Sequence, residues 1–403
     1  MASWRTVIIA GAGIGGLTAA LAIARHGYRI LLLEQAARLP ATGAGIQLSP
    51  NASRILIMLG LRDRLAPHLA IPEEVTVANA RNGRLLARLP LGGSAEARYG
   101  APYWVIHRGD LQAALREAVA ANPDITVRLG TRVDDFAVHG NGVTVAAHSL
   151  EGTVEERGAA LVGADGLWSP LRARLGHAAA PRFAGHTAWR ALVPVDACGL
   201  SVPAVNLWLA RGGHVVHYPV KAGRVINIVA ITRDDWREPG WSAPADCAEV
   251  LSRFRPRSWR GPRELLGAAD RWAKWALYEA APLPYWGQGP VTLLGDAAHP
   301  MLPYLAQGAA MAIEDAAELS QCLAFVRDDP TRAMRAYEER RLPRTARVQR
   351  AARRSGGLYH MSGLAGALRS LAFAALNGER LIARYDWLYG WTAGGTDPVA
   401  VTE

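Results

Sequence analysis

The sequence predicts an α/β protein in which a Rossmann-like dinucleotide-binding domain is interleaved with an antiparallel-sheet domain and followed by C-terminal helices. The first observation is a glycine-rich strand, turn, helix and second strand at residues 7–34. The second is a pair of short apolar strands, far apart in the chain, that each lead into an Asp. The third is a middle region rich in Trp and turns, where the residue pattern is that of antiparallel strands.

The composition is that of an ordinary globular protein with room for a large core. Half of the 403 residues are hydrophobic, so more than one lobe is expected. The formal net charge is +10, but Lys occurs only at Lys221 and Lys274, and Arg is spread over most of the chain. This spread favours a compositional bias over a nucleic-acid-binding surface. We therefore expect no nucleic-acid partner.

The cysteines and the hydropathy pattern point to the cytoplasm. Cys198, Cys247 and Cys322 are odd in number and widely spaced, which argues against a disulfide framework, and no Cys/His cluster has the spacing of zinc ligands. The N-terminus enters a strand almost at once, which leaves no room for a signal peptide. No apolar run approaches the roughly 18 residues that a membrane span needs. We predict a cytoplasmic protein without integral membrane association.

The N-terminal segment has the pattern of a complete βαβ dinucleotide-binding unit. A strand at 7–10 runs into the sequence GAGIGG, then an apolar helix to about residue 25 and a second strand at 29–33. Gly11 permits the tight turn, Gly13 lets the backbone approach a pyrophosphate, and Gly16 brings the helix against the strand. Glu34 ends the second strand and can accept hydrogen bonds from a ribose.

Two short segments that follow have two interpretations each. The stretch GAGIQLSPNAS at 43–53 is either a plain connection or a loop against the ligand, and Gln47 among small residues favours the loop. Arg108 lies at a strand-to-helix junction, where it could meet a phosphate or a flavin edge or pair with a nearby acid. Hairpins are predicted for 75–89 and for 133–148.

Two carboxylates at strand ends predict one extended ligand. Asp165 follows a buried strand at 160–164, and Asp296 follows another at 291–294. After Asp296 come a Pro-broken loop with Pro303 and a helix that opens near residues 307–308. Unpaired N–H groups at a helix N-terminus attract electron-rich atoms, so this stretch suits a ligand with sugar hydroxyls and a polar ring. The other interpretation is a tight turn capped by Asp296.

An antiparallel meander at 205–232 carries the candidate catalytic side chains. The two-residue period of its middle strand places His214, Val216 and Tyr218 on one face and His217 on the other. His214 and Tyr218 could line a polar pocket, although a solvated or hydrogen-bonded strand face is the simpler interpretation of either side chain alone. The Trp residues of this region could keep such a pocket dry or could belong to the core. Helices are expected at 307–325 and from 331 to about 353.

Three separated motifs together resemble the class A flavoprotein monooxygenases, the single-component FAD-dependent aromatic hydroxylases. They are GAGIGG with Glu34, GADGLWSPLR from Gly163 and LLGDAAHPMLPYLAQG from Leu293. Within that family the chain is most similar to the group of salicylate hydroxylase, 3-hydroxybenzoate 6-hydroxylase and 6-hydroxynicotinate 3-monooxygenase. Four segments are close to the usual sequence pattern of that group: GAGIQLSPNA, HRGDL, TAWRALVP and RYDWLYG.

The resemblance implies a function, a set of ligands and a site. It implies that a domain of the glutathione-reductase type binds FAD. NADH or NADPH would be a transient co-substrate, and O₂ would add to the reduced flavin to give a C4a-hydroperoxide. The substrate would be a small phenolic aromatic acid, and the protein a monomer or homodimer. Catalytic residues would be His214 and Tyr218, which engage the phenolic oxygen. Cofactor-binding residues would be Gly11, Gly13, Gly15, Gly16, Glu34, Gln47, Arg108, Asp165, Asp296, Pro303, Gly308 and Ala309.

Some positions depart from the family pattern. The third motif ends in Ala306-Gln307-Gly308-Ala309-Ala310, without the usual Asn at 310. Glu279-Ala280 replaces a common Asp-Arg, Pro303 stands where the 3-hydroxybenzoate enzyme has Gln, and Gln47 stands where the hydroxynicotinate enzyme has His. Each departure bears on the substrate and the flavin contacts rather than on the reaction class.

The expected domain division follows from the order of these elements. The FAD-binding domain takes residues 1–74, 100–180 and 271–330, the substrate-binding domain takes 75–99 and 181–270, and 331–403 forms a C-terminal helical region. Three alternative functions stay open. They are the same flavin chemistry on a larger ring such as a quinolone or polyketide, a flavin redox protein that does not hydroxylate, and an NAD(P)-dependent dehydrogenase. The dehydrogenase would leave the motifs around Asp165 and Asp296 unexplained.

Overall fold

The computed structural model describes residues 5–39, 43–150, 152–177, 179–197, 203–238, 240, 242–255, 259–375 and 378–395. Cys198 lies outside these ranges, and Cys247 and Cys322 are both free. In this part of the chain no helix combines the length and the apolar composition that a bilayer crossing requires. Nor do these residues include a group of His, Cys, Asp and Glu side chains placed to hold a metal ion.

A parallel sheet forms the centre of the dinucleotide-binding half. Its five strands have the order β18-β11-β1-β2-β7 and are β1 (Thr6–Ala10), β2 (Arg29–Leu33), β7 (Ile125–Arg128), β11 (Ala160–Gly163) and β18 (Val291–Leu293). All four pairings are parallel. The strands are buried apolar runs, as expected of a parallel sheet with both faces covered. Helices α1 (Ile14–Ala24), α5 (Arg108–Ala120) and α9 (Gly308–Phe325) pack together beside it.

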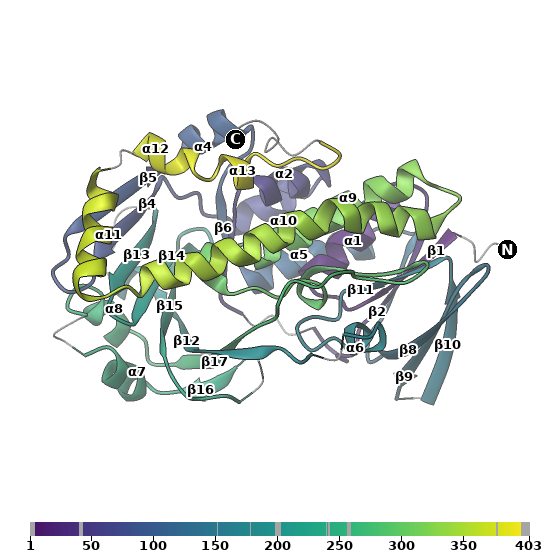
Figure 1. The fold of residues 1–403 in the computed structure, drawn as a ribbon, viewed down its shortest axis with the longest axis horizontal. Coiled ribbons are helices and arrows are strands. Elements are labelled where there is room, and N and C mark those ends of the chain that lie inside the picture. The colour runs from purple at the N-terminus through teal and green to yellow at the C-terminus, as the bar shows by residue number, and fades with distance from the viewer. Residues whose placement is uncertain are drawn as a thin grey trace.

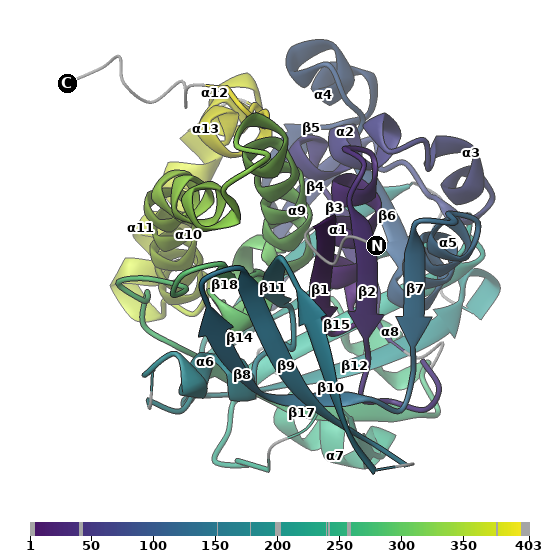
Figure 2. The same ribbon diagram turned by 90° about the vertical axis from the view of Figure 1, so that its right-hand side faces the viewer.

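A smaller antiparallel sheet lies against the parallel one. It has the order β10-β9-β8 and consists of β8 (Arg132–His139), β9 (Gly142–Ser149) and β10 (Gly152–Gly158). Figure 2 shows this sheet beside β1 and β11. The hairpin predicted around Gly140-Asn141-Gly142 is confirmed, and β10 adds a strand that was not predicted.

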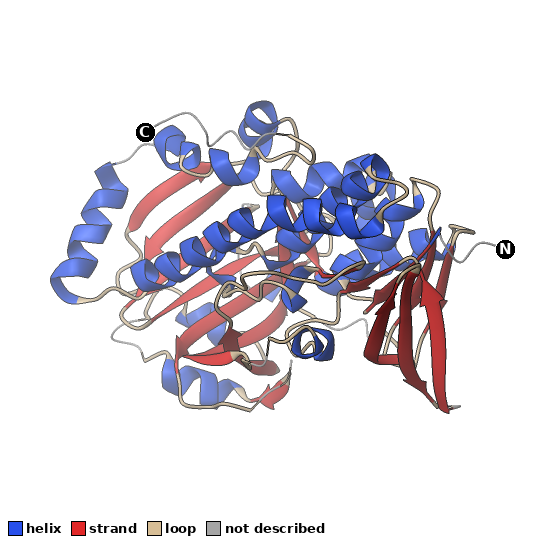
Figure 3. Ribbon diagram, turned by 45° about the vertical axis from the view of Figure 1, so that its right-hand side comes forward, coloured by secondary structure: helices blue, strands red, loops and turns tan. Residues whose placement is uncertain are grey.

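The third sheet has eight strands and is mainly antiparallel. Its order is β16-β17-β12-β15-β14-β13-β4-β5, with β4 (Glu74–Asn79), β5 (Leu85–Pro90), β12 (Arg182–Pro194), β13 (Ala204–Ala210), β14 (Gly213–Val220), β15 (Val225–Arg233), β16 (Ala243–Ala245) and β17 (Trp272–Glu279). The predicted meander and the first predicted hairpin are both present. Figure 3 shows this sheet and the β8–β10 sheet towards opposite ends of the molecule.

The remaining elements connect and cover the sheets. Strands β3 (Gly45–Leu48) and β6 (Trp104–His107) form a two-stranded sheet. The other helices are α2 (Pro50–Met58), α3 (Arg62–Leu65), α4 (Gly92–Tyr99), α6 (Pro170–Arg174), α7 (Cys247–Arg253), α8 (Arg263–Gly267), α10 (Pro330–Tyr359), α11 (Gly363–Ala375), α12 (Gly378–Ala383) and α13 (Asp386–Tyr389). Helices α11 and α12 contact β5. The α/β fold class predicted from the sequence is confirmed.

Two boundaries differ from the sequence expectation. Helix α10 continues to Tyr359, beyond the end expected near Arg353, and Figure 1 shows it running lengthwise across the molecule from beside α9 towards α11. Strand β17, assigned to the FAD-binding domain by the boundary at 271, pairs with β12 and β16 in the eight-stranded sheet. The domain division stays a prediction, and the strand pairing favours a boundary after Glu279.

Three of the Trp residues of the middle region are core residues. Trp189, Trp259 and Trp272 are buried in one hydrophobic cluster with side chains of β12, β15, α7 and α8. Trp275, on β17, lies on the other side of the sheet and faces a cavity. The larger core lies around the parallel sheet and the helices α1, α5 and α9.

Candidate functional site

One cavity joins the glycine turn of the parallel sheet to a face of the eight-stranded sheet. Its volume is about 540 Å³, and its walls come from the N-termini of α1 and α9, from β3 and from one face of β14. Of the predicted site residues, those that line it are Gly13, Gly15, Gln47, Arg108, His214, Tyr218, Asp296, Pro303, Gly308 and Ala309. Residues that the chain separates by up to about 300 positions therefore share one space. Gly11, Gly16, Glu34 and Asp165 do not line the cavity, although Gly16 and Asp165 directly follow residues that do.

Three of the four glycines at 11–16, Gly11, Gly13 and Gly16, show how this turn is built. Gly11 has φ +106°, and a Cβ there would overlap the carbonyl of Ala164. A Cβ on Gly16 would overlap the carbonyl oxygen of Gly11, so only Gly lets the helix pack this closely. A Cβ on Gly13 would meet no protein atom within 4 Å, because that side of the backbone is open. This is the arrangement in which a backbone is available to a pyrophosphate.

Glu34 fixes the shape of this turn. Its Oε2 accepts a hydrogen bond from the backbone N–H of Ala12 at 2.7 Å, and its Oε1 accepts one from Ala36 at 2.8 Å. The carboxylate is buried at the end of β2. Helix α1 begins at Ile14 and receives no side-chain cap at Gly13. Its first N–H groups are therefore available to an electron-rich ligand.

Asp165 and Asp296 follow neighbouring strands, β11 and β18. Burial raises the pKa of each carboxyl group above its ordinary value. The Oδ1 atom of Asp165 is buried and has no hydrogen-bond partner among the described residues. Arg172 connects the two loops, since its Nη1 donates to the carbonyl of Ala297 at 3.1 Å and its Nη2 to that of Leu167 at 2.5 Å. An unsatisfied buried carboxylate oxygen at this place is suited to a ligand that brings a hydroxyl donor.

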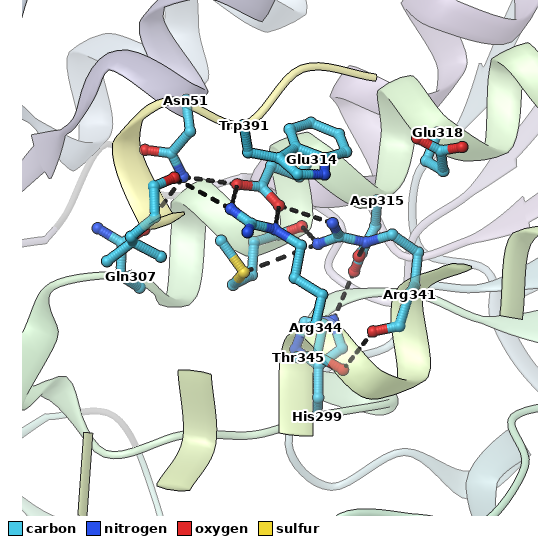
Figure 4. A network of polar contacts seen from close by, with 12 residues as sticks. Asn51, His299, Gln307, Glu314, Asp315, Glu318, Arg341, Arg344, Thr345 and Trp391 are labelled. Carbon is cyan, nitrogen blue, oxygen red and sulfur yellow. Dashed lines mark hydrogen bonds and ion pairs between the residues drawn. The ribbon is translucent and has the colours of Figure 1, made fainter. Parts of the chain in front are cut away.

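The loop before α9 is held from behind by a buried ionic network (Figure 4). Glu314 accepts hydrogen bonds from Arg341 at 2.6 Å and from Arg344 at 2.6 and 2.7 Å, and the amide of Asn51 donates to Glu314 at 2.6 Å and to Gln307 at 3.2 Å. Through Asn51, the network of α9 and α10 therefore positions Gln307. The loop that Gln307 ends forms one wall of the cavity.

The same network determines the charge states of its carboxylates. Burial alone would raise the pKa of Asp315, but His299 and Arg341 outweigh it and lower that pKa to about 2. Burial opposes the ionisation of Glu314 as well, and Arg344 with Arg341 reverses the effect, so its pKa lies below the ordinary value. Both carboxylates are therefore ionised at neutral pH and form buried ion pairs.

Ala306 and Ala310, at the two ends of this segment, have different surroundings. Ala306 has φ +54° and ψ +34°, a left-handed conformation that favours Gly, and it lines the cavity. Ala310 is completely buried in the large core and does not line the cavity. Position 310, where the usual Asn is missing, therefore lies in the core of the described structure, whereas Gly308 and Ala309 present the start of the helix to the cavity.

The far end of the cavity combines apolar walls with two cations. His214 and Tyr218 project from β14 on one face, as the two-residue period predicts, and both are buried. Tyr103 donates its hydroxyl hydrogen to Gln47 Oε1 at 2.7 Å. Arg108 and Arg190 line the same space, and the Arg190 guanidinium lies 3.4 Å from the centroid of Trp275.

The pKa shifts of the groups at this end of the cavity indicate a site that is poorly hydrated and has a positive potential. Burial, and then the charge of Arg108, lowers the pKa of Arg190 to about 10. Burial raises the pKa of Tyr218 above its ordinary value and, together with His360 and His186, places the pKa of His214 well below the ordinary 6.5. His214 is therefore neutral at neutral pH and can accept a proton, and Tyr218 keeps its proton.

Sequence reasoning missed several side chains around His214. The Nδ1 of His214 lies 3.0 Å from Nε2 of His360, and the rings of His186, Tyr304 and Tyr359 surround the pair. The period of β12 places His186 and Arg190 on one face and could have indicated both. The position of His360 depends on α10 reaching Tyr359, so a helix that ends near Arg353 gives no indication of it.

His217 lies on the opposite face of β14, as predicted. It lines a second cavity of about 400 Å³, its Nε2 accepts a hydrogen bond from Trp208 at 3.0 Å, and its Nδ1 has no partner among the described residues. Burial lowers the pKa of His217 to about 4.

The low pKa of His217 predicts that acid weakens the fold. In the unfolded chain His titrates near about 6.5, so between that pH and about 4 the unfolded state binds more protons than the folded state. The free energy of unfolding should therefore decrease as the pH falls from about 6.5 to 4. Below pH 4 this histidine should cause no further decrease. Urea denaturation at several pH values should give a shallower dependence for His217→Gln, and an unchanged slope would contradict this account.

Comparisons with known proteins agree with the geometry. The model of the FAD binding domain family matches residues 5–352. The 3-hydroxybenzoate 6-hydroxylase 1 of Aquipseudomonas alcaligenes is 39% identical over 95% of this chain and 97% of its own length. The 6-hydroxynicotinate 3-monooxygenase of Bordetella bronchiseptica is 36% identical over 85% of this chain and 89% of its own length. A solved salicylate hydroxylase substrate complex superposes with a TM-score of 0.80 and 26% identity over 96% of both chains.

Proposed function

The chain belongs to the FAD binding domain family and is an FAD-dependent monooxygenase, and we propose that it hydroxylates a small phenolic aromatic acid such as a hydroxybenzoate or hydroxynicotinate. The observation that carries the proposal is the single cavity in which the glycine turn and the α9 N-terminus meet His214 and Tyr218. A cofactor and a substrate ring can therefore lie in one space. The similarity to 3-hydroxybenzoate and 6-hydroxynicotinate hydroxylases supports the substrate class.

The residues at the turn fit FAD. The open backbone at Gly13, the uncapped start of α1 and the unsatisfied Oδ1 of Asp165 offer what a pyrophosphate and sugar hydroxyls need. We assign the adenosine ribose to Glu34 and the ribityl chain to Asp296. Gly308 and Ala309 would pack beside the flavin ring, with Arg108 at its edge. When bound and reduced by NADH or NADPH, FAD supplies the activation of O₂.

The protein's part of the chemistry is to bind, orient and deprotonate the phenol. Arg108 and Arg190 give this end of the cavity a positive potential, which favours an anionic aromatic acid. His214 is neutral and can accept the phenolic proton, and the Tyr218 hydroxyl can donate a hydrogen bond to the same oxygen. A phenolate is more reactive towards an electrophilic oxygen than a phenol. The buried aromatic and aliphatic walls exclude water from the reacting atoms.

A substitution at Gly13 can test FAD binding without changing the stability of the fold. Replacing Gly13 with Ala should leave the thermal stability of the FAD-free protein unchanged, because the added methyl meets no protein atom, and its extended backbone suits Ala. The methyl would occupy the approach of the pyrophosphate, so we expect the Kd for FAD to rise by about tenfold or more, or about 1.4 kcal/mol. FAD titration by fluorescence quenching measures this effect.

Gly16→Ala is the matched control for that experiment. Its methyl would overlap the Gly11 carbonyl, so it should lower the thermal stability itself. A Gly13→Ala protein that binds FAD as tightly as the unchanged chain would show that the pyrophosphate does not lie on this turn.

A larger substrate is the second candidate. The cavity extends past the face of β14 to Val77 and Leu89 on the sheet and to Phe373 and Leu381 on the C-terminal helices. These apolar walls offer room for a ring system beyond a single benzoate.

We also propose that the protein is cytoplasmic and that it is a monomer or a homodimer. We propose that it is divided into two interleaved domains. These three proposals do not depend on which substrate it uses.

A substrate panel tests the proposed function. Hydroxylated benzoates and nicotinates, with a quinolone for comparison, should be assayed by NADH and NADPH consumption, and the product masses measured. We expect at least one phenolic acid to stimulate the consumption of NADH or NADPH and to yield a product that is one oxygen atom heavier. Stimulation by the quinolone alone would favour the larger substrate, and consumption without any oxygenated product would indicate a flavin redox protein that does not hydroxylate.

A further inference from the structure

His214 is one member of a chain of histidines that leads away from the cavity. Its Nδ1 faces Nε2 of His360 at 3.0 Å, so a hydrogen of one ring lies on the lone pair of the other. This leaves Nε2 of His214 to meet a molecule in the cavity that His214 lines. The ring centroid of His360 lies 4.8 Å from that of His186. We call His214 and His360 the histidine pair.

The pair extends from a buried position towards the surface. His214 is 4% exposed, whereas His360 is half-buried and immediately precedes the exposed residues Met361 and Ser362 at the end of α10. Arg369 of α11 holds this end, since its Nη1 donates to the carbonyls of Leu358 and Tyr359 at 3.0 and 2.9 Å. His360 therefore lies between Tyr359, which lines the cavity, and the exposed residues Met361 and Ser362.

The groups around the pair oppose the accumulation of positive charge. His186 on β12, Arg233 on β15 and Arg369 on α11 contribute positive or protonatable groups, and Tyr304 and Tyr359 contribute neutral phenols. Burial, followed by His186, Arg233 and Arg369, lowers the pKa of His360 to about 4. Both rings are neutral at neutral pH. A proton taken by His214 is therefore poorly held there and has to move on.

We propose that His360 is a positioning residue that acts through His214 and relays the substrate's phenolic proton between the cavity and solvent. The proposal rests on the proposed function, because it requires a phenol in the cavity. It goes beyond that function by assigning a route for the proton, and no carboxylate is part of the route.

The relay releases one proton to solvent for each proton that it takes from the phenol. The phenolic O–H bond breaks, and its proton bonds to Nε2 of His214 while the proton on Nδ1 of His214 passes to Nε2 of His360. The proton on Nδ1 of His360 leaves to water, so the site gains a phenolate and solvent gains one proton. After hydroxylation, a proton that returns by the reverse path protonates the product oxygen and restores both tautomers. No charge stays on either ring, and nothing is oxidised or reduced along the route.

The test compares two histidines in the FAD-bound enzyme. His360→Gln can still hydrogen-bond to His214 but cannot pass a proton, whereas His217→Gln changes a buried histidine on the opposite face of the same strand. With a phenolic acid identified by the panel, we expect kcat of His360→Gln to fall by about 10²-fold, the low end of the usual contribution of an acid–base group, with the KM of the aromatic acid little changed. We expect His217→Gln to keep the kcat of the unchanged enzyme at pH 7.5 and above.

Chemical rescue distinguishes a relay from a packing effect. Imidazole added to a His360→Ala enzyme should restore much of the lost kcat, with a dependence on pH that follows the imidazole titration. If His360→Ala fails to bind FAD, the kcat of His360→Gln decides alone. An unchanged kcat in His360→Gln, or a reduced kcat that imidazole does not raise in a folded His360→Ala enzyme, would overturn the relay. If the unchanged enzyme hydroxylates no phenolic acid, the proposed function fails first, and the relay fails with it.

Discussion

Replacing His214 with Gln is expected to lower kcat for a phenolic acid by about 10²- to 10⁴-fold, the usual contribution of a positioned base. The Gln amide can hydrogen-bond to the substrate oxygen but cannot accept its proton. FAD affinity should not change, because His214 lies on the eight-stranded sheet, away from the glycine turn. Stopped-flow measurement of product formation at saturating substrate tests this prediction directly.

The pH dependence adds a second prediction about His214. Burial lowers the pKa of His214 well below 6.5, so the base stays neutral down to a pH below that value. The acid limb of kcat should therefore lie below pH 6.5 and should be absent from the residual activity of His214→Gln. A variant that hydroxylates at an unchanged rate across this range would show that His214 is not the base.

Replacing Glu314 with Gln is expected to lower the free energy of unfolding by about 3–5 kcal/mol, the usual cost of breaking a buried ion pair on one side. Glu314 is completely buried and accepts from both Arg341 and Arg344, so the change removes one negative charge that two buried cations share. Because Asn51 links Glu314 to Gln307, FAD affinity should fall as well. Urea denaturation and FAD titration measure the two effects.

Two further variants make the Glu314 prediction specific. Glu339→Gln changes an exposed carboxylate on α10 and should alter the free energy of unfolding by no more than about 0.5 kcal/mol. Adding Arg344→Met to Glu314→Gln removes one of the two cations that Glu314 binds and should recover part of the loss. A loss below about 1 kcal/mol in Glu314→Gln would mean that the network does not hold this part of the fold.

The fold was predictable where a local pattern determines the structure. The glycine spacing at 11–16 requires a tight turn and close helix packing, and the alternation along 214–218 determines which side chains share a face. Asp165 and Asp296 could be expected together because each follows a buried strand, and β11 and β18 are indeed neighbours. These features depend on a few residues and on the geometry of one element.

The rest depended on contacts between distant segments. The position of His360 beside His214 requires α10 to reach Tyr359 and to cross the molecule, and no pattern of a few residues records that distance. The pairing of β17 with β12 likewise depends on the sheet already formed, so the boundary at 271 could not show it. The ionic network around Glu314 joins α2, α9 and α10, and the sequence shows only that α10 is rich in Arg.

We propose that this FAD-dependent monooxygenase transfers one oxygen atom from O₂ to the ring of a phenolic acid bound beside His214. The most direct measurement is the reaction under isotopically labelled O₂, with NADH consumption and the mass of the product followed together. We expect one labelled oxygen atom in each product molecule and one NADH consumed for each. Consumption of NADH with formation of hydrogen peroxide and no label in any aromatic product would contradict it.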